Sequence, residues 1–333
     1  MKLISKEEFL TLAGDLDVFP FCFQKDYLVA ESGIFFLLDN DTIAPVKINR
    51  NKILKTLQFQ FTPLFLNGIS LEKKEERIFL EKAIDFIIKN KLAHRIIQPK
   101  NYVLFNVLPD KVKSCPFGTY RIVLTGKTGE KLLEAMQARY RSAIRQTEKL
   151  NVEIKYGLSE LQTFQKLHSE TMDRTNAYSE NYNSLKKELT SAPNNTILAT
   201  VYIDNNIQGG LYIMYSKFCA YYFHGASAHT TQASGAIKYL HYKIMCMMQD
   251  KGVMHYDFVG ARLSDVSGTK LEGIQNFKKR FGPQLIKGYL WKMDIDKPRC
   301  SAYDNLLKIK CKLKRTKFPL DIIDQEKNKK IIL

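Results

Sequence analysis

The chain has 333 residues, with 51 Lys and Arg against 34 Asp and Glu, and therefore carries a formal net charge of +17. Hydrophobic residues make up 45% of the sequence, including 20 Phe and 17 Tyr, so the chain can bury a large core and is not a disordered polypeptide. Its six Cys are scattered without a CxxC pair or metal-ligand spacing, which excludes a small disulfide scaffold and predicts no metal site.

The first half of the chain mixes helices and strands. Ser5 and Glu8 form a capping box that predicts a short first helix. Apolar runs and turn residues predict the further elements of this half: strands at 33–38 and 43–48, an irregular loop or edge strand at 57–66, a charged helix at 71–91, and short strands at 96–98 and 102–105.

The clearest predicted helix spans residues 128–150. Arg141 and Arg145 lie one turn apart beside its apolar face. That face consists of Leu132, Met136, Tyr140 and Ile144. A new strand (151–156) and a capped helix starting at Ser159 follow, so we place a domain junction at residue 150.

The second half repeats the mixed pattern. Its expected elements are a hairpin of strands 196–203 and 207–215, a third adjacent strand at 218–223, a helix at 233–251, a strand at 253–258, a helix at 271–281 and a strand at 285–295. The chain therefore reads as a mixed α/β protein of two domains, 1–150 and 151–298, with a basic C-terminal tail at 299–333.

Three segments carry more specific motifs. They are RYRSAIRQTEKLNVEI (139–154), YFHGAS (222–227), and YDFVG (256–260) followed by GIQNFKKRFG (273–282). Together they resemble the FemABX family of peptidoglycan-bridge aminoacyltransferases: the first resembles its basic helix exit, and the third its "Y-D-F-x-G … G-I-x-x-F-K-x-x-F-G" signature. The resemblance spans roughly residues 30–295.

The resemblance implies a fold and an activity. The fold would be two tandem acetyltransferase-like (GNAT) domains, here without the coiled-coil arm that some members carry. The activity would be transfer of an aminoacyl group from aminoacyl-tRNA to an amino group of a peptidoglycan precursor, with no further cofactor. It also implies that the Phe277–Lys278 pair lies at the active site.

Acyl transfer to an amine requires a neutral amine and a stabilised oxyanion, and three residues are candidates for these tasks. Lys278 could supply positive charge, although a solvated lysine is the alternative. Asp257, at a strand end, could orient the amine or act as a base, or could simply cap the following loop. His224 could deprotonate an ammonium, or could be a histidine satisfied at a strand end.

The candidates for substrate binding surround these three residues. Alternation along one strand predicts that Tyr222 and His224 point to the same face, and Gly225 follows where a backbone could admit an acyl group. The full set of binding candidates is Phe277, Tyr256, Gly260, Tyr222, Gly225, Arg141, Arg145, Lys47 and Arg174.

The donor is not determined by these residues. Gln232 and Gly235 fit half of the motif by which GNAT enzymes hold acyl-CoA, but Ile237 stands where that motif ends in a small residue. An N-acyltransferase that uses acyl-CoA or acyl carrier protein on an amino sugar of a capsule or lipopolysaccharide is therefore the first alternative. A non-catalytic RNA- or membrane-binding protein with this fold is the second.

The charge and the apolar runs bear on location and partners. No signal peptide is visible and no apolar run reaches the roughly 20 residues of a membrane helix, so we expect a cytoplasmic protein, with a peripheral position at the inner face of the membrane left open. The basic segment 308–317 could contact tRNA phosphates or anionic lipid headgroups, but no motif for sequence-specific RNA reading is present.

Overall fold

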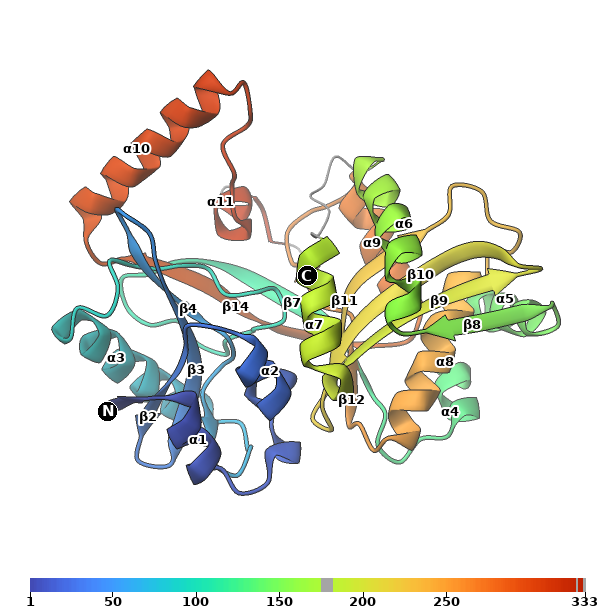
Figure 1. The fold of residues 1–333 in the computed structure, drawn as a ribbon, viewed down its shortest axis with the longest axis horizontal. Helices are drawn as coiled ribbons and strands as arrows, with labels where there is room; N and C mark the ends of the chain where they lie inside the picture. Colours follow the sequence, from blue (N-terminus) through green and yellow to red (C-terminus); the bar gives the residue numbers. More distant parts are fainter. Residues whose placement is uncertain (175–181, 328, 332–333) are drawn as a thin grey trace.

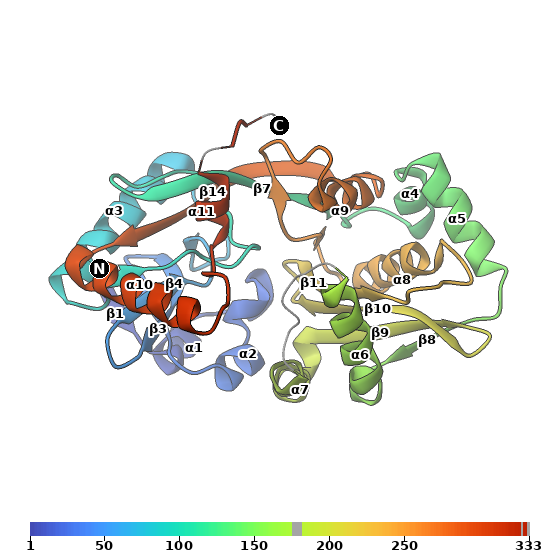
Figure 2. The ribbon, with the colours of Figure 1, turned by 90° about the horizontal axis from the view of Figure 1, so that it is seen from above.

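The computed structural model describes residues 1–174, 182–327 and 329–331. Two lobes stand side by side and share one mixed sheet (Figures 1 and 2). The strand order is β1-β2-β3-β4-β6-β14-β7-β12-β11-β10-β9-β8, with β5 paired to β3 and β13 paired to β7. The prediction of a mixed α/β fold in two similar halves is thus confirmed.

The first lobe is built from the N-terminal third of the chain. Its elements are β1 (Lys2–Ile4), α1 (Lys6–Leu12), α2 (Lys25–Ala30), β2 (Ile34–Asp39), β3 (Thr42–Arg50), β4 (Lys55–Phe59), β5 (Leu64–Phe65), α3 (Lys73–Lys89) and β6 (Arg95–Ile96). Helix α1 begins at the predicted capping box, in which Ser5 accepts from the backbone N–H of Glu8. The expected strand at 102–105 contributes only an isolated bridge between Phe105 and Tyr289.

The second lobe contains the rest of the sheet and the helices on its two faces. Its elements are β7 (Lys113–Val123), α4 (Gly129–Glu134), α5 (Ala138–Glu148), β8 (Val152–Tyr156), α6 (Leu161–Asp173), α7 (Tyr182–Ser191), β9 (Thr196–Ile203), β10 (Asn206–Tyr215), β11 (Ala220–Ser227), α8 (Ala236–Asp250), β12 (His255–Asp257), β13 (Ala261–Arg262), α9 (Lys270–Lys279) and β14 (Gln284–Asp294). Helices α4, α5, α8 and α9 cover one face and α6 and α7 the other.

Strands β7 and β14 join the lobes. β14 pairs along nine residues with β7 and then, through Met293 and Asp294, with β6. Strand β7 is not predicted from the sequence, because Pro116 and Gly118 are typical strand breakers. Pro116 is tolerated because it pairs with β14 on one side of β7, and on the other side the pairing of β7 with β13 begins only at Phe117. Gly118 is required because a Cβ there would lie 2.8 Å from the carbonyl oxygen of Ile286.

The predicted basic helix at 128–150 is interrupted. Its apolar face is buried as expected, but the helix is interrupted between α4 and α5, where the Gln137 N–H donates to the carbonyl of Arg280 at 3.0 Å. The Arg141 guanidinium donates to the carbonyls of Glu134 and Met136, which the break leaves without helical partners. The helix pair packs on α8, so α4 and α5 lie in the second lobe, on the N-terminal side of the predicted domain junction at residue 150.

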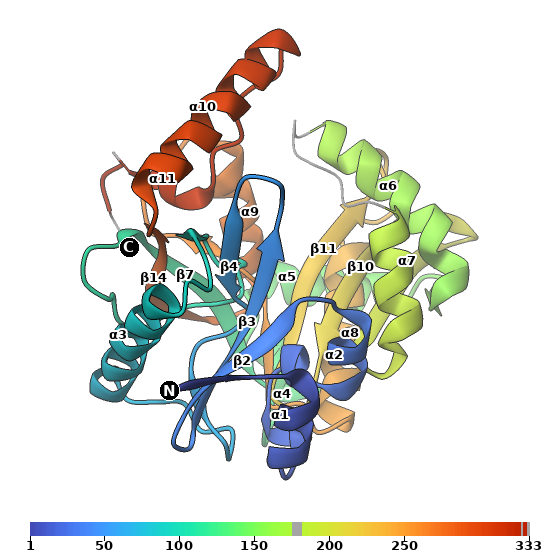
Figure 3. The ribbon, with the colours of Figure 1, turned by 60° about the vertical axis from the view of Figure 1, so that its left-hand side comes forward.

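The C-terminal segment is more than a tail. Helix α10 (Lys297–Leu313) projects from the first lobe, and α11 (Ile322–Glu326) returns to the seam of the sheet, where Ile323 is buried (Figures 1 and 3). Glu326 accepts from Arg262 and Ser264 there. None of the helices in the described ranges is both long and apolar enough to span a bilayer.

Candidate active site

The candidate site is centred on a separation between two parallel strands. β11 and β12 pair only at Ala220–Tyr256 and Tyr221–Asp257. Beyond these residues β11 continues beside β10, whereas the segment that follows β12 turns away toward β13. β11 also carries a bulge, because His224 pairs with Tyr212 and Tyr222 with Ile213, which leaves Phe223 without a partner in the register.

The bulge overturns one expectation about β11. Tyr222 packs against His241 of α8, with ring centroids 4.7 Å apart, whereas His224 packs against His168 of α6, on the opposite face of the sheet. Alternation would place the two side chains on one face, but the extra residue at Phe223 reverses the alternation. Of the two side chains Tyr222 and His224, His224 is therefore the one that faces the space between the lobes.

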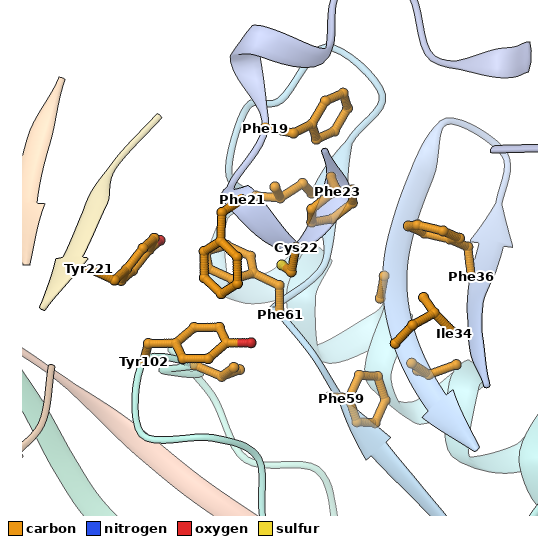
Figure 4. Close-up of a cluster of buried hydrophobic side chains, with 14 of the residues drawn as sticks. Phe19, Phe21, Cys22, Phe23, Ile34, Phe36, Phe59, Phe61, Tyr102 and Tyr221 are labelled. Carbon is orange, nitrogen blue, oxygen red and sulfur yellow. The ribbon is translucent and has the colours of Figure 1, made fainter. Parts of the chain in front are cut away.

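A cavity of about 640 Å³, the inter-lobe cavity, lies on the α7 side of β11. It is lined by Phe223 and His224 of β11 and by Val259, which follows β12. Its opposite wall comes from the first lobe, because Phe21 and Tyr102 pack against Tyr221 and Phe223 with ring centroids 5.3–5.6 Å apart, as Figure 4 shows for Tyr221. Its charged side chains are Glu31, Lys47, Lys100, Lys187 and Glu188.

A second cavity of about 710 Å³, the α5–α8 cavity, lies on the other face of the sheet. Three cationic side chains line it: Arg139, Lys238 and Arg280. Among the described residues none of the three has a carboxylate within salt-bridge distance, and burial together with the two guanidiniums lowers the pKa of Lys238. Helix α8 begins beside it without a side-chain cap. Such a site favours an anionic ligand.

Lys278 lines neither cavity but is close to both: its neighbour Phe277 lines the α5–α8 cavity, and its Nζ reaches Val259, which lines the inter-lobe cavity. Its side chain is buried, and Nζ donates to the carbonyl oxygens of Val259 and Gly260, both at 2.8 Å. Burial lowers the pKa of Lys278 to about 8, although Asp257 acts in the opposite direction. An ammonium has three donors, so one remains for a ligand. The two parts of the third sequence motif, the Asp257–Gly260 loop and the segment that carries Lys278, are thus in contact.

Asp257 anchors the loop that holds Lys278. Its fully buried carboxylate accepts from Thr119 Oγ1 (2.5 Å), Arg121 Nε (3.0 Å) and the backbone N–H of Val259 (2.8 Å). The following residues, Val259 and Gly260, have φ of +49° and +83°, a conformation that the Asp257 contact to Val259 helps to hold. The geometry favours a positioning role over that of a base.

His224 lines the inter-lobe cavity as a neutral imidazole. Burial, with smaller contributions from His168 and Lys100, lowers the pKa of His224 to about 4. A general base works best with a pKa near the operating pH, so His224 is better suited to orient an amine than to hold its proton at neutral pH.

The remaining predicted residues divide between the cavities and the protein interior. Lys47 lines the inter-lobe cavity and pairs with Glu31 at 2.5 Å, and Phe277 lines the α5–α8 cavity. Tyr256 is fully buried, with its hydroxyl 2.8 Å from Nδ1 of His241. Gly225 leaves room for the Tyr222 hydroxyl, which would lie 1.8 Å from a Cβ.

The predicted arginines lie outside both cavities. Arg141 caps α4, as described above, and Arg145 is exposed and pairs with Glu130 at 2.9 Å. Arg174 donates to the carbonyl of Ser227 at 2.8 Å. Arg139, on the same helix as Arg145, lines the α5–α8 cavity instead. Sequence reasoning missed it because a helical wheel ranks faces by their apolar residues and does not show which basic face a neighbouring helix will adjoin.

The half-motif at 232–236 has packing roles in the structure. A Cβ on Gly235 would lie 2.3 Å from the carbonyl oxygen of Ala143, so this glycine allows α8 to approach α5. The side chain of Gln232 accepts from that of Gln208 at 3.1 Å. Close helix packing therefore accounts for these residues without reference to a particular donor.

Comparisons with known proteins agree with this picture. Residues 135–279 match the family model of the acetyltransferase (GNAT) domain, called Acetyltransf_6. No curated protein sequence matches the chain. Among solved structures, FemX has a TM-score of 0.65 and 14% identity, with 90% of this chain and 98% of FemX covered.

Two further structures resemble the chain more distantly. The C-terminal domain of a candidate lysylphosphatidylglycerol synthetase from Agrobacterium fabrum has a TM-score of 0.52 and 12% identity, over 91% of this chain and 97% of that one. L-PGS from Bacillus licheniformis has a TM-score of 0.51 and 12% identity, over 86% and 90% of the two chains. The segment that matches the GNAT acetyltransferase model thus contains Lys278 and the residues that line the α5–α8 cavity except Arg280, and the chain has the overall fold of FemX.

Proposed function

We propose that the chain is an acyltransferase that moves an aminoacyl group from aminoacyl-tRNA to an amino group of a nucleotide- or lipid-linked precursor of peptidoglycan. The observation that carries the proposal is the separation of β11 from β12, with Lys278 behind it and one cavity on each face. An acyl group that enters from one cavity would meet an amine held in the other.

The charges suggest which substrate occupies which cavity. The cations of the α5–α8 cavity, which have no carboxylate partner among the described residues, suit the phosphates of the donor. The inter-lobe cavity offers both lysines and carboxylates, which suits an acceptor that carries anionic groups as well as an amine. The resemblance to FemABX enzymes supports aminoacyl-tRNA as the donor, and such a reaction would take place in the cytoplasm.

The chemistry would be direct transfer. The amine nitrogen forms a bond to the carbonyl carbon, the ester C–O bond breaks, and the proton lost by the nitrogen ends on the leaving ribose oxygen. The third N–H of Lys278 would stabilise the oxyanion or that leaving oxygen, while His224 orients the amine. No covalent enzyme intermediate is required.

A labelled-donor assay tests the proposal. The purified chain would be given labelled aminoacyl-tRNA or labelled acyl-CoA, each with a nucleotide-linked muropeptide or a nucleotide-linked amino sugar. We expect label from aminoacyl-tRNA on the muropeptide. Transfer from acyl-CoA to the amino sugar, with aminoacyl-tRNA inert, would instead establish the N-acyltransferase alternative, and no transfer from any donor would favour a non-catalytic protein.

Arg139→Ala is expected to raise the KM for the anionic donor by about ten-fold or more with a small change in kcat, because one charge-assisted contact to phosphate is lost. The matched control is Arg145→Ala on the same helix, where the guanidinium is exposed and paired with Glu130. Steady-state kinetics with varied donor measure both. If the two substitutions change the KM for the donor equally, the donor does not bind in the α5–α8 cavity.

A further inference from the structure

Among the described residues, the N-terminal half of helix α10 makes its hydrogen bonds to the first lobe. Cys300 is 1% exposed and contacts the carbonyl of His94, and Asp304 accepts two hydrogen bonds from the guanidinium of Arg95, both at 2.8 Å. The rest of the helix rises away from the first lobe, so its C-terminal end stands clear of the sheet (Figures 1 and 3). The C-terminal end of α10 is therefore exposed to the surroundings, while the N-terminal half of the helix is fixed to the first lobe.

The projecting half of α10 exposes an apolar stripe. Leu306, Ile309 and Leu313 are 53%, 56% and 80% exposed. Their spacing of three and four residues places them on one face of the helix, opposite the face that carries Cys300. Three large aliphatic side chains in a row on a projecting helix are costly to leave in water, which indicates that this face contacts something apolar.

Basic residues border this stripe on both sides. At 100° per residue, Lys310 lies beside one edge of the stripe and Lys312 beside the other. Residues 305–320 contain six Lys or Arg and no Asp or Glu. An apolar stripe between basic flanks is the pattern of a helix that lies in the plane of an anionic lipid surface.

We propose that α10 docks the protein on an anionic membrane surface, with Leu306, Ile309 and Leu313 in the headgroup–acyl boundary and the flanking lysines on the lipid phosphates. The charge complementarity selects a phospholipid surface, and the stripe distinguishes it from RNA, whose phosphates would need the lysines but not three aliphatic side chains. This inference is independent of the acyl-transfer proposal, because α10 contributes no residue to either cavity of the candidate site.

Vesicle co-sedimentation of the full chain tests the proposal. We expect binding to vesicles of mixed phosphatidylglycerol and phosphatidylcholine, weakening as salt increases, and little binding to phosphatidylcholine alone. Leu306→Ser with Ile309→Ser is expected to weaken binding at least ten-fold. The matched control is Ile78→Ser with Ile88→Ser on α3, whose side chains are exposed to a similar degree (45% and 42%) and should leave binding unchanged.

The charges are tested separately. Lys310→Gln with Lys312→Gln should weaken binding to the anionic vesicles by about 25-fold, at roughly five-fold per lysine, whereas Lys73→Gln with Lys74→Gln on α3 should not. All four variants should unfold at the wild-type temperature. Absence of vesicle binding by the wild type, equal binding to both vesicle types, or an unchanged Leu306/Ile309 variant would overturn the proposal. Lysine-dependent tRNA binding that is insensitive to the leucine and isoleucine changes would assign the helix to RNA.

Discussion

Replacing Lys278 by methionine is expected to lower kcat by two to three orders of magnitude and to leave the KM for the donor almost unchanged. Methionine keeps the apolar stem but removes the buried ammonium that the carbonyls of Val259 and Gly260 hold close to both cavities. Loss of a preorganised donor to a developing oxyanion typically has an effect of this size. Single-turnover and steady-state kinetics would separate it from an effect on binding.

The matched control is Lys279→Met, one residue further along α9, where the side chain is exposed. It removes the same charge from the same helix without reaching the site, so activity should stay within about two-fold of wild type. If both variants retain wild-type activity, Lys278 has no catalytic role and the site assignment fails. If both lose activity equally, the effect belongs to the charge of the helix rather than to the buried ammonium.

The pH dependence gives a second readout of the same group. The pKa of Lys278 is lowered to about 8 by burial, so the ammonium required in the transition state is present below this pH and is lost as the pH rises through 8. The rate should therefore fall above pH 8, even though the acceptor amine becomes more nucleophilic there. In Lys278→Arg the charge persists, and the falling limb should move beyond pH 10 in whatever activity remains. A limb that stays at pH 8 would belong to another group.

The sequence predicts the parts of the candidate site whose residues are close to one another along the chain. Lys278 and the Asp257–Gly260 loop were placed together on the basis of one motif, and the structure joins them through two hydrogen bonds. The buried face of the helix predicted at 128–150 also followed from its periodicity, because burial at every third or fourth residue depends only on helix geometry.

The features that could not be predicted arise from contacts between distant segments. The bulge at Phe223 turns His224 away from Tyr222, and no residue type marks it. β7 contains Pro116 and Gly118, which are acceptable only because of where its neighbouring strands begin. Arg121, the partner of Asp257, lies 136 residues before it in the chain, and no pattern in either segment links the two side chains.

Asp257→Ala is expected to lower the free energy of unfolding by about 3 kcal/mol and to abolish most of the activity. The carboxylate is fully buried, and its removal leaves the guanidinium of Arg121 without its counter-charge and the hydroxyl of Thr119 without its acceptor. Breaking a buried ion pair from one side typically costs 3–5 kcal/mol; the lower end applies because the Arg121 side chain retains 24% of its exposure to water. Chemical denaturation would measure the change.

Asp85→Ala is the matched control, because Asp85 is exposed on α3 and its loss should change the free energy of unfolding by less than about 0.5 kcal/mol. Asp257→Asn separates the two roles of the carboxylate: the amide can still accept from the Val259 N–H but carries no charge for Arg121. If Asp257 acts by anchoring the loop, the asparagine variant should recover more activity than stability. If it acts as a base, both variants should be equally inactive, and recovery of stability alone in the asparagine variant would then assign proton transfer to this residue.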